Sequence, residues 1–285
     1  MKIAISGSSG FVGKHLTTFF RGKGDEVIPL SHSFFSAKTN EDLQTVLSGC
    51  DVVINLAGAS INQRWTASAK QKIADSRIQV TRRLVSVINA MPGKPSLFIS
   101  ASAVGIYPDE GIYTENNSSE GHSFLAKVCA LWEDEAQRLT TDVRLVITRF
   151  GIVLAMDGGA LPKMLLPFRL FIGGRMASGQ QGFSWIHIED LMYAMQFIID
   201  HPELSGPVNF VSPQPVNNQS FVEEVSVMMH RPAWFPVPAF VFRLLYGEGE
   251  IMMTKGQQAY PARLMSAGYT FRYPDLRLAL RSFLI

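Results

Sequence analysis

The chain opens with Met1-Lys2-Ile3-Ala4-Ile5-Ser6-Gly7-Ser8-Ser9-Gly10-Phe11-Val12-Gly13, an apolar run that leads into three glycines spaced three residues apart. The apolar run predicts a buried strand, and the residues that follow predict a helix. Glycines at such a junction let backbone amides approach a ligand closely, and the start of the helix adds unpaired N–H groups and a positive dipole end. We therefore interpret this turn as a site for the diphosphate of a dinucleotide, with a tight turn that holds no ligand as the alternative. The residues expected to bind it are Gly7, Ser9, Gly10, Phe11, Val12 and Gly13.

Strand and helix patterns alternate through the first half of the chain. Strands are expected at Lys2–Ser6, Glu26–Leu30, Asp51–Asn55, Leu97–Ser100 and Arg144–Arg149. Helices are expected at Val12–Arg21, Glu41–Leu47, Ser68–Asn89 and Phe124–Leu139. Unbroken Val and Ile runs are typical of parallel strands covered by helices on both faces. The predicted fold class is therefore α/β, a Rossmann doubly wound parallel sheet.

The pattern changes after Arg149, where Gly, Pro and Met become frequent. Further strands are expected at Phe183–Ile188 and Val208–Val211, and further helices at Leu191–Asp200 and Phe221–His230. We predict a dinucleotide-binding Rossmann domain over residues 1–165, to which strand 183–188 and helix 189–201 return. Residues 166–285 are predicted to form a smaller C-terminal α/β substrate or cap domain, which includes the segment 232–285.

Composition excludes several classes of protein. The chain has 285 residues, of which 47% are hydrophobic and 18% charged, so a sizeable core can form and disorder is not expected. A net charge of +2 is too small to indicate binding to nucleic acid or to a membrane surface. The two cysteines, Cys50 and Cys129, are expected as reduced thiols. Because no apolar run is long enough to span a bilayer and no signal peptide precedes the glycine turn, we expect a cytoplasmic protein. No metal site is predicted.

The end of the second strand bears on the choice between NADP and NAD. An NAD-binding protein usually carries Asp or Glu there, to bind the ribose hydroxyls. Here the strand ends Leu30-Ser31-His32-Ser33, without a carboxylate that would repel a 2′-phosphate. We therefore predict NADP as the cofactor, with NAD as the alternative and with Ser31 and His32 among its contacts. No arginine follows the strand, and Lys38 is either a charge partner for the phosphate or an ordinary exposed residue.

Several motifs resemble those of the extended short-chain dehydrogenase/reductases. They are the glycine spacing, Asn55-Leu56-Ala57-Gly58, Ser100-Ala101-Ser102 and Trp185-Ile186-His187-Ile188-Glu189-Asp190. Other stretches are similar to the family 39U type of predicted nucleoside-diphosphate-sugar epimerases, which carry a C-terminal domain of unknown function. These are Arg64-Trp65-Thr66, Ser76-Arg77, Trp132-Glu133, Gly158-Gly159-Ala160-Leu161 and Gly256-Gln257-Gln258.

The resemblance covers essentially the whole chain and implies a bound NADP(H), with a catalytic activity that is assigned by analogy. It implies a small-molecule substrate of a sugar-like kind. Further cofactor contacts that follow from it are Leu56, Ala57, Gly58, Arg77, Ser100 and Leu161.

The acid–base residues of the superfamily are not found where they are expected. Hydride chemistry there uses a Tyr whose pKa is lowered by a Lys four residues on, together with a Ser one strand earlier. Ser102 fits the Ser position, but the Tyr position is Leu125 and the Lys position is Cys129. Lys127 lies on another face of the helix. We predict Ser102 and Tyr107 as catalytic residues, while packing is the alternative for Tyr107.

Two other residues have alternative interpretations. Cys129 is either a thiolate that replaces the ammonium group or a small core residue. His187 is expected to be a structural, hydrogen-bonded histidine in an apolar strand.

The substrate side lacks one expected cation. Related epimerases place an Arg two positions before the aromatic strand, where this chain has Phe183. Arg149, Arg169 or Arg175 could compensate, or a less polar substrate could be used. Two hypotheses stay open, an NADP-dependent epimerase or oxidoreductase with an unusual acid–base group, and a non-catalytic NADP(H)-binding sensor or partner-binding protein. Helices Ser68–Asn89 and Phe124–Leu139 correspond to the pair that often forms a homodimer interface in the superfamily.

Overall fold

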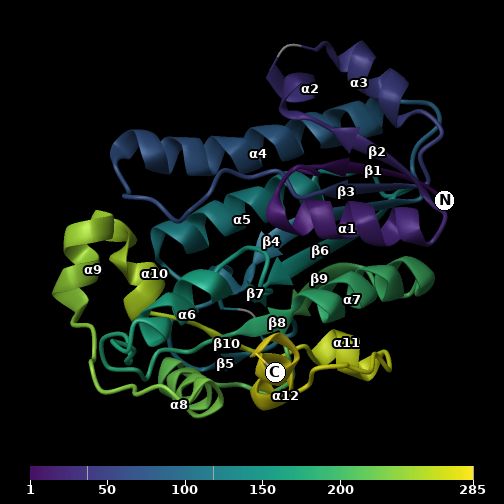
Figure 1. Cartoon of the computed structure of the whole chain (residues 1–285). Coiled ribbons are helices and arrows are strands. Elements are labelled where there is room, and N and C mark those ends of the chain that lie inside the picture. Colours follow the sequence, from purple (N-terminus) through teal and green to yellow (C-terminus); the bar gives the residue numbers. More distant parts are fainter. Residues whose placement is uncertain (37, 118, 285) are drawn as a thin grey trace.

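Six parallel strands form the central sheet of the molecule. The computed structural model describes residues 1–36, 38–117 and 119–284, and Figure 1 shows their arrangement. In sheet order the strands are β2 (Glu26–Leu30), β1 (Lys2–Ser6), β3 (Val52–Asn55), β4 (Leu97–Ala103), β6 (Arg144–Phe150) and β9 (Gly206–Phe210). Every neighbouring pair is parallel, as the unbroken apolar runs predict.

The chain begins in the interior of this sheet and reverses its direction of winding once. From β1 it passes to β2 on one side and then crosses to β3 on the other, so that Ser6 is level with both Leu30 and Asn55. At such a reversal the loops that follow the two central strands diverge and leave a crevice at the carboxyl edge of the sheet. The glycine turn that follows β1 lies at this crevice.

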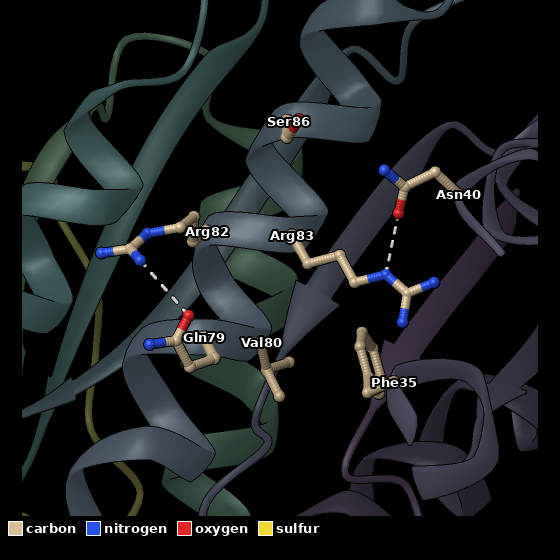
Figure 2. A pocket seen from close by; sticks show the side chains of 7 residues that line it. All are labelled: Phe35, Asn40, Gln79, Val80, Arg82, Arg83 and Ser86. Carbon is tan, nitrogen blue, oxygen red and sulfur yellow. Dashed lines mark hydrogen bonds between the residues drawn. The ribbon is translucent and has the colours of Figure 1, made fainter. Parts of the chain in front are cut away.

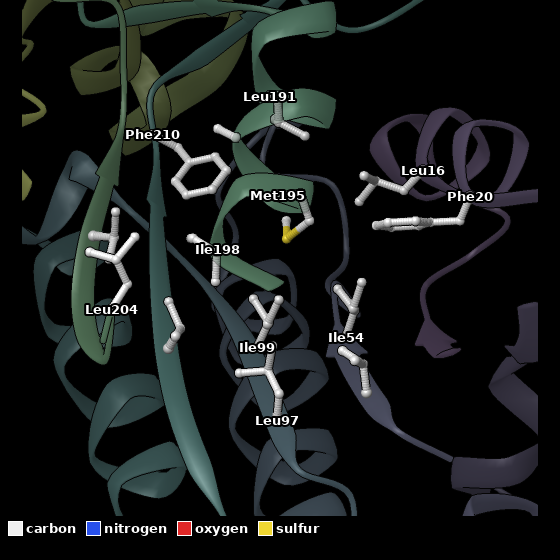
Figure 3. Close-up of a cluster of buried hydrophobic side chains, with 14 of the residues drawn as sticks. Leu16, Phe20, Ile54, Leu97, Ile99, Leu191, Met195, Ile198, Leu204 and Phe210 are labelled. Carbon is white, nitrogen blue, oxygen red and sulfur yellow. The ribbon is translucent and has the colours of Figure 1, made fainter. Parts of the chain in front are cut away.

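Helices cover both faces of the sheet. One face packs against α1 (Phe11–Gly22) and α7 (Ile188–Asp200), and Figure 3 shows their apolar side chains meeting those of the strands. The other face packs against α3 (Asn40–Leu47), α4 (Ala67–Ala90) and α5 (Phe124–Gln137). In Figure 1, α4 and α5 lie on one side of the sheet, and α1 and α7 on the other. The predicted doubly wound fold is confirmed.

A smaller unit adjoins the carboxyl edge and has a hydrophobic cluster of its own. It contains a two-stranded sheet of β7 (Ile152–Leu154) and β8 (Trp185–His187), with α6 (Leu161–Arg169), α8 (Asn218–Met229) and α12 (Leu276–Leu284). The C-terminal segment adds α9 (Ala239–Tyr246), α10 (Ile251–Thr254) and α11 (Ala262–Ser266). Its strand β10 (Gln258–Ala259) pairs with β5 (Ile112–Tyr113) of the first half. The domain boundary at residue 165 stays a prediction.

The bounds of most elements agree with the sequence patterns to within a few residues. The exceptions in the first half are α2 (His32–Ser36), a short helix directly after β2, and the two-residue strand β5, where the sequence predicted no regular element. Short 3-10 turns occupy Val104–Ile106 and Gly247–Glu250. Across the ranges 1–36, 38–117 and 119–284, no helix combines the length and the apolar character that crossing a bilayer requires.

Candidate functional site

The glycine turn packs its backbone against the loop that follows β3. Gly7 has a φ of +69°, the left-handed region that favours glycine. A Cβ on Gly7 would lie 2.8 Å from the carbonyl oxygen of Leu56, and a Cβ on Gly13 would lie 2.2 Å from the carbonyl oxygen of Gly7. These two glycines are therefore required for the turn itself. Gly10 is exposed, and a Cβ there would approach Gly7 O only to 3.1 Å.

The N-terminus of α1 is open to an anion. Gly10 occupies the N-cap position, no side chain caps the helix, and its first turn contains no acidic residue. Ser9 and Gly10 are exposed, while Phe11 and Val12 are half-buried. The first N–H groups of a helix lack partners within the helix, so this end offers donors and a positive dipole to a negatively charged group.

The loop before α6 closes on the same helix terminus. A Cβ on Gly158 would lie 2.6 Å from the ring of Phe11, so only glycine fits there. The imidazole of His15 lies 3.0 Å from the Asp157 carboxylate. Leu161, which begins α6, is fully buried, so its side chain packs in the core of the smaller unit.

A half-buried cation lies behind the loop that follows β3. Arg77 of α4 donates hydrogen bonds to the carbonyl oxygens of Ala59 and Ile73, each at 3.0 Å. A Cβ on Gly58 would lie 2.9 Å from its guanidinium carbon, and the group lies over the ring of Trp132 at 5.5 Å. Burial lowers the pKa of Arg77. Within the described ranges Arg77 forms no ion pair, so its positive charge faces this loop without compensation.

The residues predicted to bind the adenosine ribose and its phosphate are on the surface at the end of β2. Ser31, His32 and Lys38 are all exposed. The Ser31 and Ser33 hydroxyls are 2.7 Å apart. Ser100, in contrast, is fully buried in β4, and its hydroxyl has no hydrogen-bond partner among the described residues.

Ser102 belongs to a buried ionic network. Its hydroxyl donates to Glu133 Oε1 at 2.6 Å. Arg149 donates from Nε to the same oxygen at 2.9 Å and from Nη2 to Oε2 at 2.7 Å. Glu133 and Arg149 are only 4% and 5% exposed. Burial opposes the charge of Arg149, but the hydrogen bonds and attraction of Glu133 outweigh it and raise the pKa of the guanidinium.

Tyr107 extends the network toward β9. Its hydroxyl accepts from Arg149 Nη1 and donates to Asn209 Oδ1, both at 2.8 Å. The side chain is 1% exposed, and burial raises its pKa. The backbone N–H of Asn209 donates to the buried Glu115 at 2.8 Å. The structure therefore brings the two predicted catalytic residues together, but with their hydroxyls bonded to protein groups; their catalytic role stays a prediction.

The positions counted for the Tyr and Lys of the superfamily lie on α5 beside this network. Leu125 is half-buried and Cys129 is buried, whereas Lys127 is exposed on another face, as predicted. Burial and the nearby Glu133 raise the pKa of the Cys129 thiol to about 12. Cys129 is therefore protonated near neutral pH, which favours the core-residue interpretation over a thiolate.

Burial bears on three residues that the sequence analysis discussed, namely Arg149, Phe183 and His187. Arg149 faces Glu133 in the interior, so its charge is already paired, which disfavours the alternative that it meets a substrate's phosphates. Phe183 is buried against Phe221. His187 is confirmed as a structural histidine, since Nδ1 accepts from the N–H of Glu189 and Nε2 contacts the Ser282 hydroxyl. Arg169 and Arg175 are exposed and stay candidates.

Sequence reasoning missed the partners in the network. Glu133 and Glu115 were not singled out, because a carboxylate in an apolar helix or a loop reads as a surface group until its cation is known. The motif Trp132-Glu133 carried a signal only through its resemblance to the family, since adjacent helical residues point in different directions and a neighbouring tryptophan does not indicate burial. Among the residues that the structure describes, no cluster of His, Cys, Asp and Glu could hold a metal ion.

Two family models match the chain. The model of the NAD dependent epimerase/dehydratase family matches residues 3–211, and that of a domain of unknown function (DUF1731) matches residues 237–283. The first covers the sheet, the glycine turn and the buried network. The second covers the C-terminal segment from α9 to α12.

Relatives and solved structures match over the full length. The chain is 38% identical to the epimerase family protein YfhF of Bacillus subtilis, over 98% of this chain and 97% of the relative. It is 35% identical to a chloroplastic SDR39U1 homolog of Arabidopsis thaliana, over 100% and 87% of the two chains. The crystal structure of human epimerase family protein SDR39U1 with NADPH has a TM-score of 0.90 and 30% identity, over 100% and 99%.

Proposed function

The chain belongs to the NAD-dependent epimerase/dehydratase family, and from this premise we propose that it binds NADP(H) at the carboxyl edge of its central sheet. The observation that carries the proposal is the uncapped N-terminus of α1 behind an open glycine, Gly10. It is supported by the likeness to human SDR39U1, which was crystallised with NADPH. When bound, the nicotinamide would supply a hydride donor or acceptor.

The residues around the crevice have distinct parts in this proposal. The backbone amides of Phe11 and Val12 bind the diphosphate, which the uncompensated charge of Arg77 also attracts, while the N–H of Gly10 donates to Gly7 O within the turn. The loop Leu56–Gly58 lies beside the dinucleotide, and Ser31 and His32 bind the adenosine ribose. We assign Ser100 and Leu161 to the buried rear of the same site, where they shape it without offering an exposed side chain.

The proposed reaction is an epimerisation or oxidoreduction of a small, sugar-like molecule, with Ser102 and Tyr107 as its catalytic residues. The condition is that the bonds from Ser102 to Glu133 and from Tyr107 to Arg149 and Asn209 exchange for bonds to substrate. A reduced cytoplasm as its location is part of the proposal, because both cysteines are free and buried.

A second candidate is a non-catalytic NADP(H)-binding protein, a sensor or a partner-binding module. The observation that favours it is the same network, because a fully bonded, buried Tyr107 does not meet a ligand in this conformation. A screen of nucleotide sugars and other carbonyl compounds with NADPH separates the two. Oxidation of the cofactor by one class of compound supports the enzyme, whereas tight binding with no oxidation across the panel supports the second candidate.

The cofactor site is tested by replacing Gly10 with Val. A Cβ there would lie 3.1 Å from Gly7 O, a tight contact that requires a small shift of the turn, and the new methyl groups would cover the helix terminus. Loss of two charge-assisted hydrogen bonds predicts at least about 100-fold weaker NADPH binding in a fluorescence titration. Gly93→Val is the matched control, since Gly93 is exposed and open and lies away from the crevice. Unchanged affinity of a folded Gly10→Val protein would refute the proposal.

A further inference from the structure

The end of β2 carries no arginine of its own, but the fold brings one there from α4. Asn55 at the end of β3 donates to the Thr81 hydroxyl at 2.7 Å, and Asn55, Ser6 and Leu30 are level in the sheet. The middle of α4 therefore lies at the height of the strand ends. Arg83 follows Thr81 by two residues on this helix.

The guanidinium of Arg83 is held against the segment that follows β2. Its Nε donates to Asn40 Oδ1 at 2.9 Å, and its Nη2 donates to the carbonyl oxygen of Lys38 at 2.5 Å. In the described part of the chain, Nη1 has no hydrogen-bond partner and the group forms no ion pair. The Nη1 group with its two N–H donors, and the positive charge of this half-buried side chain, are thus available to a ligand.

Hydrogen bonds connect this cation to the two serines at the end of β2. The N–H of Lys38 donates to the carbonyl oxygen of Ser33 at 3.2 Å, and the Ser33 and Ser31 hydroxyls are 2.7 Å apart. Lys38 itself is exposed. The guanidinium of Arg83 is thus joined through the backbone of Lys38 to the segment that carries the two hydroxyls, where this fold presents the adenosine ribose.

A hollow beside the guanidinium provides room for a phosphate. Its volume is about 370 Å³, and Figure 2 shows Arg83 reaching across it toward Asn40 and Phe35. The lining residues are Phe35, Asn40, Gln79, Val80, Arg82, Arg83 and Ser86.

The acidic groups near this hollow are already engaged. Glu135 pairs with the lining residue Arg82 at 2.7 Å. The Asp42 carboxylate accepts hydrogen bonds from the N–H and hydroxyl of Thr39 and so caps α3. Those bonds, with Lys38 and Arg83 nearby, hold the pKa of Asp42 below its usual value. Both carboxylates thus have partners other than Arg83, whose charge keeps an attraction for an anion at the hollow.

We propose that Arg83, assisted by Lys38, binds the 2′-phosphate of NADP(H) and sets the preference of this chain for NADP over NAD. The inference rests on the proposed function and adds to it the residue that selects the cofactor. It explains how a chain without an arginine after β2 can still recognise the phosphate, because the same charge comes from a helix about fifty residues later in the sequence.

The experiment measures the dissociation constants of NADPH and NADH by fluorescence for the wild type and for Arg83→Gln. One lost charge-assisted contact predicts NADPH binding about 10- to 100-fold weaker. NADH binding should be unchanged within about two-fold, since it lacks the phosphate. Arg83→Lys should retain most of the preference, which covers the case in which Arg83→Gln does not fold. Lys38→Gln should have a smaller effect in the same direction.

Arg138→Gln is the matched control. Arg138 is a 66% exposed cation at the end of α5 that faces Glu135 at 3.5 Å and does not line the hollow. Its replacement should leave both affinities unchanged. An equal loss of NADPH and NADH binding in Arg83→Gln would mean that Arg83 only supports the local fold, and unchanged NADPH binding would mean that it does not meet the phosphate; either overturns the inference. A wild type that binds neither nucleotide contradicts the proposed function itself, and a wild type that prefers NADH contradicts the inference alone.

Discussion

The pairing of Glu133 with Arg149 is the residue-level feature that distinguishes the interior of this chain. Two nearly unexposed charges share two hydrogen bonds, and Ser102 and Tyr107 satisfy further atoms of the pair. Removing ions from water is costly, so such a pair is stable only while both partners and their hydrogen bonds are present. The network lies where its superfamily carries acid–base residues, and it holds β4, α5 and β6 together.

Glu133→Gln should therefore destabilise the protein strongly. The uncompensated charge of Arg149 predicts a loss of about 3–5 kcal/mol in the free energy of unfolding, measured by urea denaturation. The double variant Glu133→Gln/Arg149→Met removes the stranded charge and should be more stable than Glu133→Gln alone. If the free energy of unfolding of Glu133→Gln were within about 1 kcal/mol of wild type, the ion pair would not have the stabilising role that we assign to it.

At the scale of elements, the junction of β8 and α7 depends on one histidine. His187 ends the strand and caps the helix, because its Nδ1 accepts from the N–H of Glu189 at 3.0 Å. Its ring is stacked between Tyr273 and Phe283, with centroids 3.7 and 4.5 Å away. Burial lowers the pKa of His187 to about 4 from an ordinary value of 6.5. The cap thus requires a neutral imidazole.

This shift predicts a pH dependence of stability. Below pH 6.5 the unfolded chain binds a proton at His187, while the folded chain does so only near pH 4. The contribution of the neutral His187 to the free energy of unfolding is therefore complete above pH 6.5. It is lost as the pH falls toward 4, by about 3 kcal/mol in all. His187→Asn keeps a capping side chain without this titration, so the stability difference between wild type and variant should narrow by that amount between pH 7.5 and pH 4. A constant difference would contradict the assignment.

The helices and strands were largely predictable from the sequence, because their bounds depend on residues that are adjacent in the chain. The strands β1 and β2 agree with their predicted bounds because an apolar run ends at a turn residue in each case. The helix α2 was missed, since Ser-His-Ser-Phe-Phe-Ser contains no strong helix former and its structure depends on the surroundings.

The candidate site likewise has one part that adjacent residues predict and another part that only long-range packing creates. The glycine turn could be read from neighbouring residues, whereas the buried network joins Tyr107 to Asn209 across 102 positions. Arg83 likewise reaches Lys38 from 45 positions away. Such pairs are created when α4 and α5 pack on the sheet and β9 joins its edge, and no pattern of adjacent residues predicts them.

At the scale of the molecule, α4 and α5 present a shared outer face. The two helices lie side by side in Figure 1 and are joined by the Arg82–Glu135 ion pair and by a hydrogen bond from Trp132 to Thr81. Leu131 of α5 is 52% exposed on this pair. Because the two helices correspond to the pair that often forms a homodimer interface in the superfamily, we propose that a second copy of this chain covers this face.

Leu131→Arg tests that proposal. Burying a charge from each copy near the centre of a symmetric interface should convert the dimer into a monomer in sedimentation velocity, with an unchanged circular dichroism spectrum. Leu278→Arg, a similarly exposed leucine on α12, is the control and should stay dimeric. A wild type that sediments as a monomer would refute the proposal.

The network at the centre of the molecule also has a consequence for synthesis. Asn209 donates to the carbonyl oxygen of Tyr260, and Glu115 accepts from the backbone N–H of Arg263, so the end of the chain completes what residues near 100 begin. While the last residues are still inside the ribosome, Asn209 and Glu115 lack these two partners, although the Glu133–Arg149 pair can already form. We therefore expect the final packing of β9 against this network to follow release of the chain.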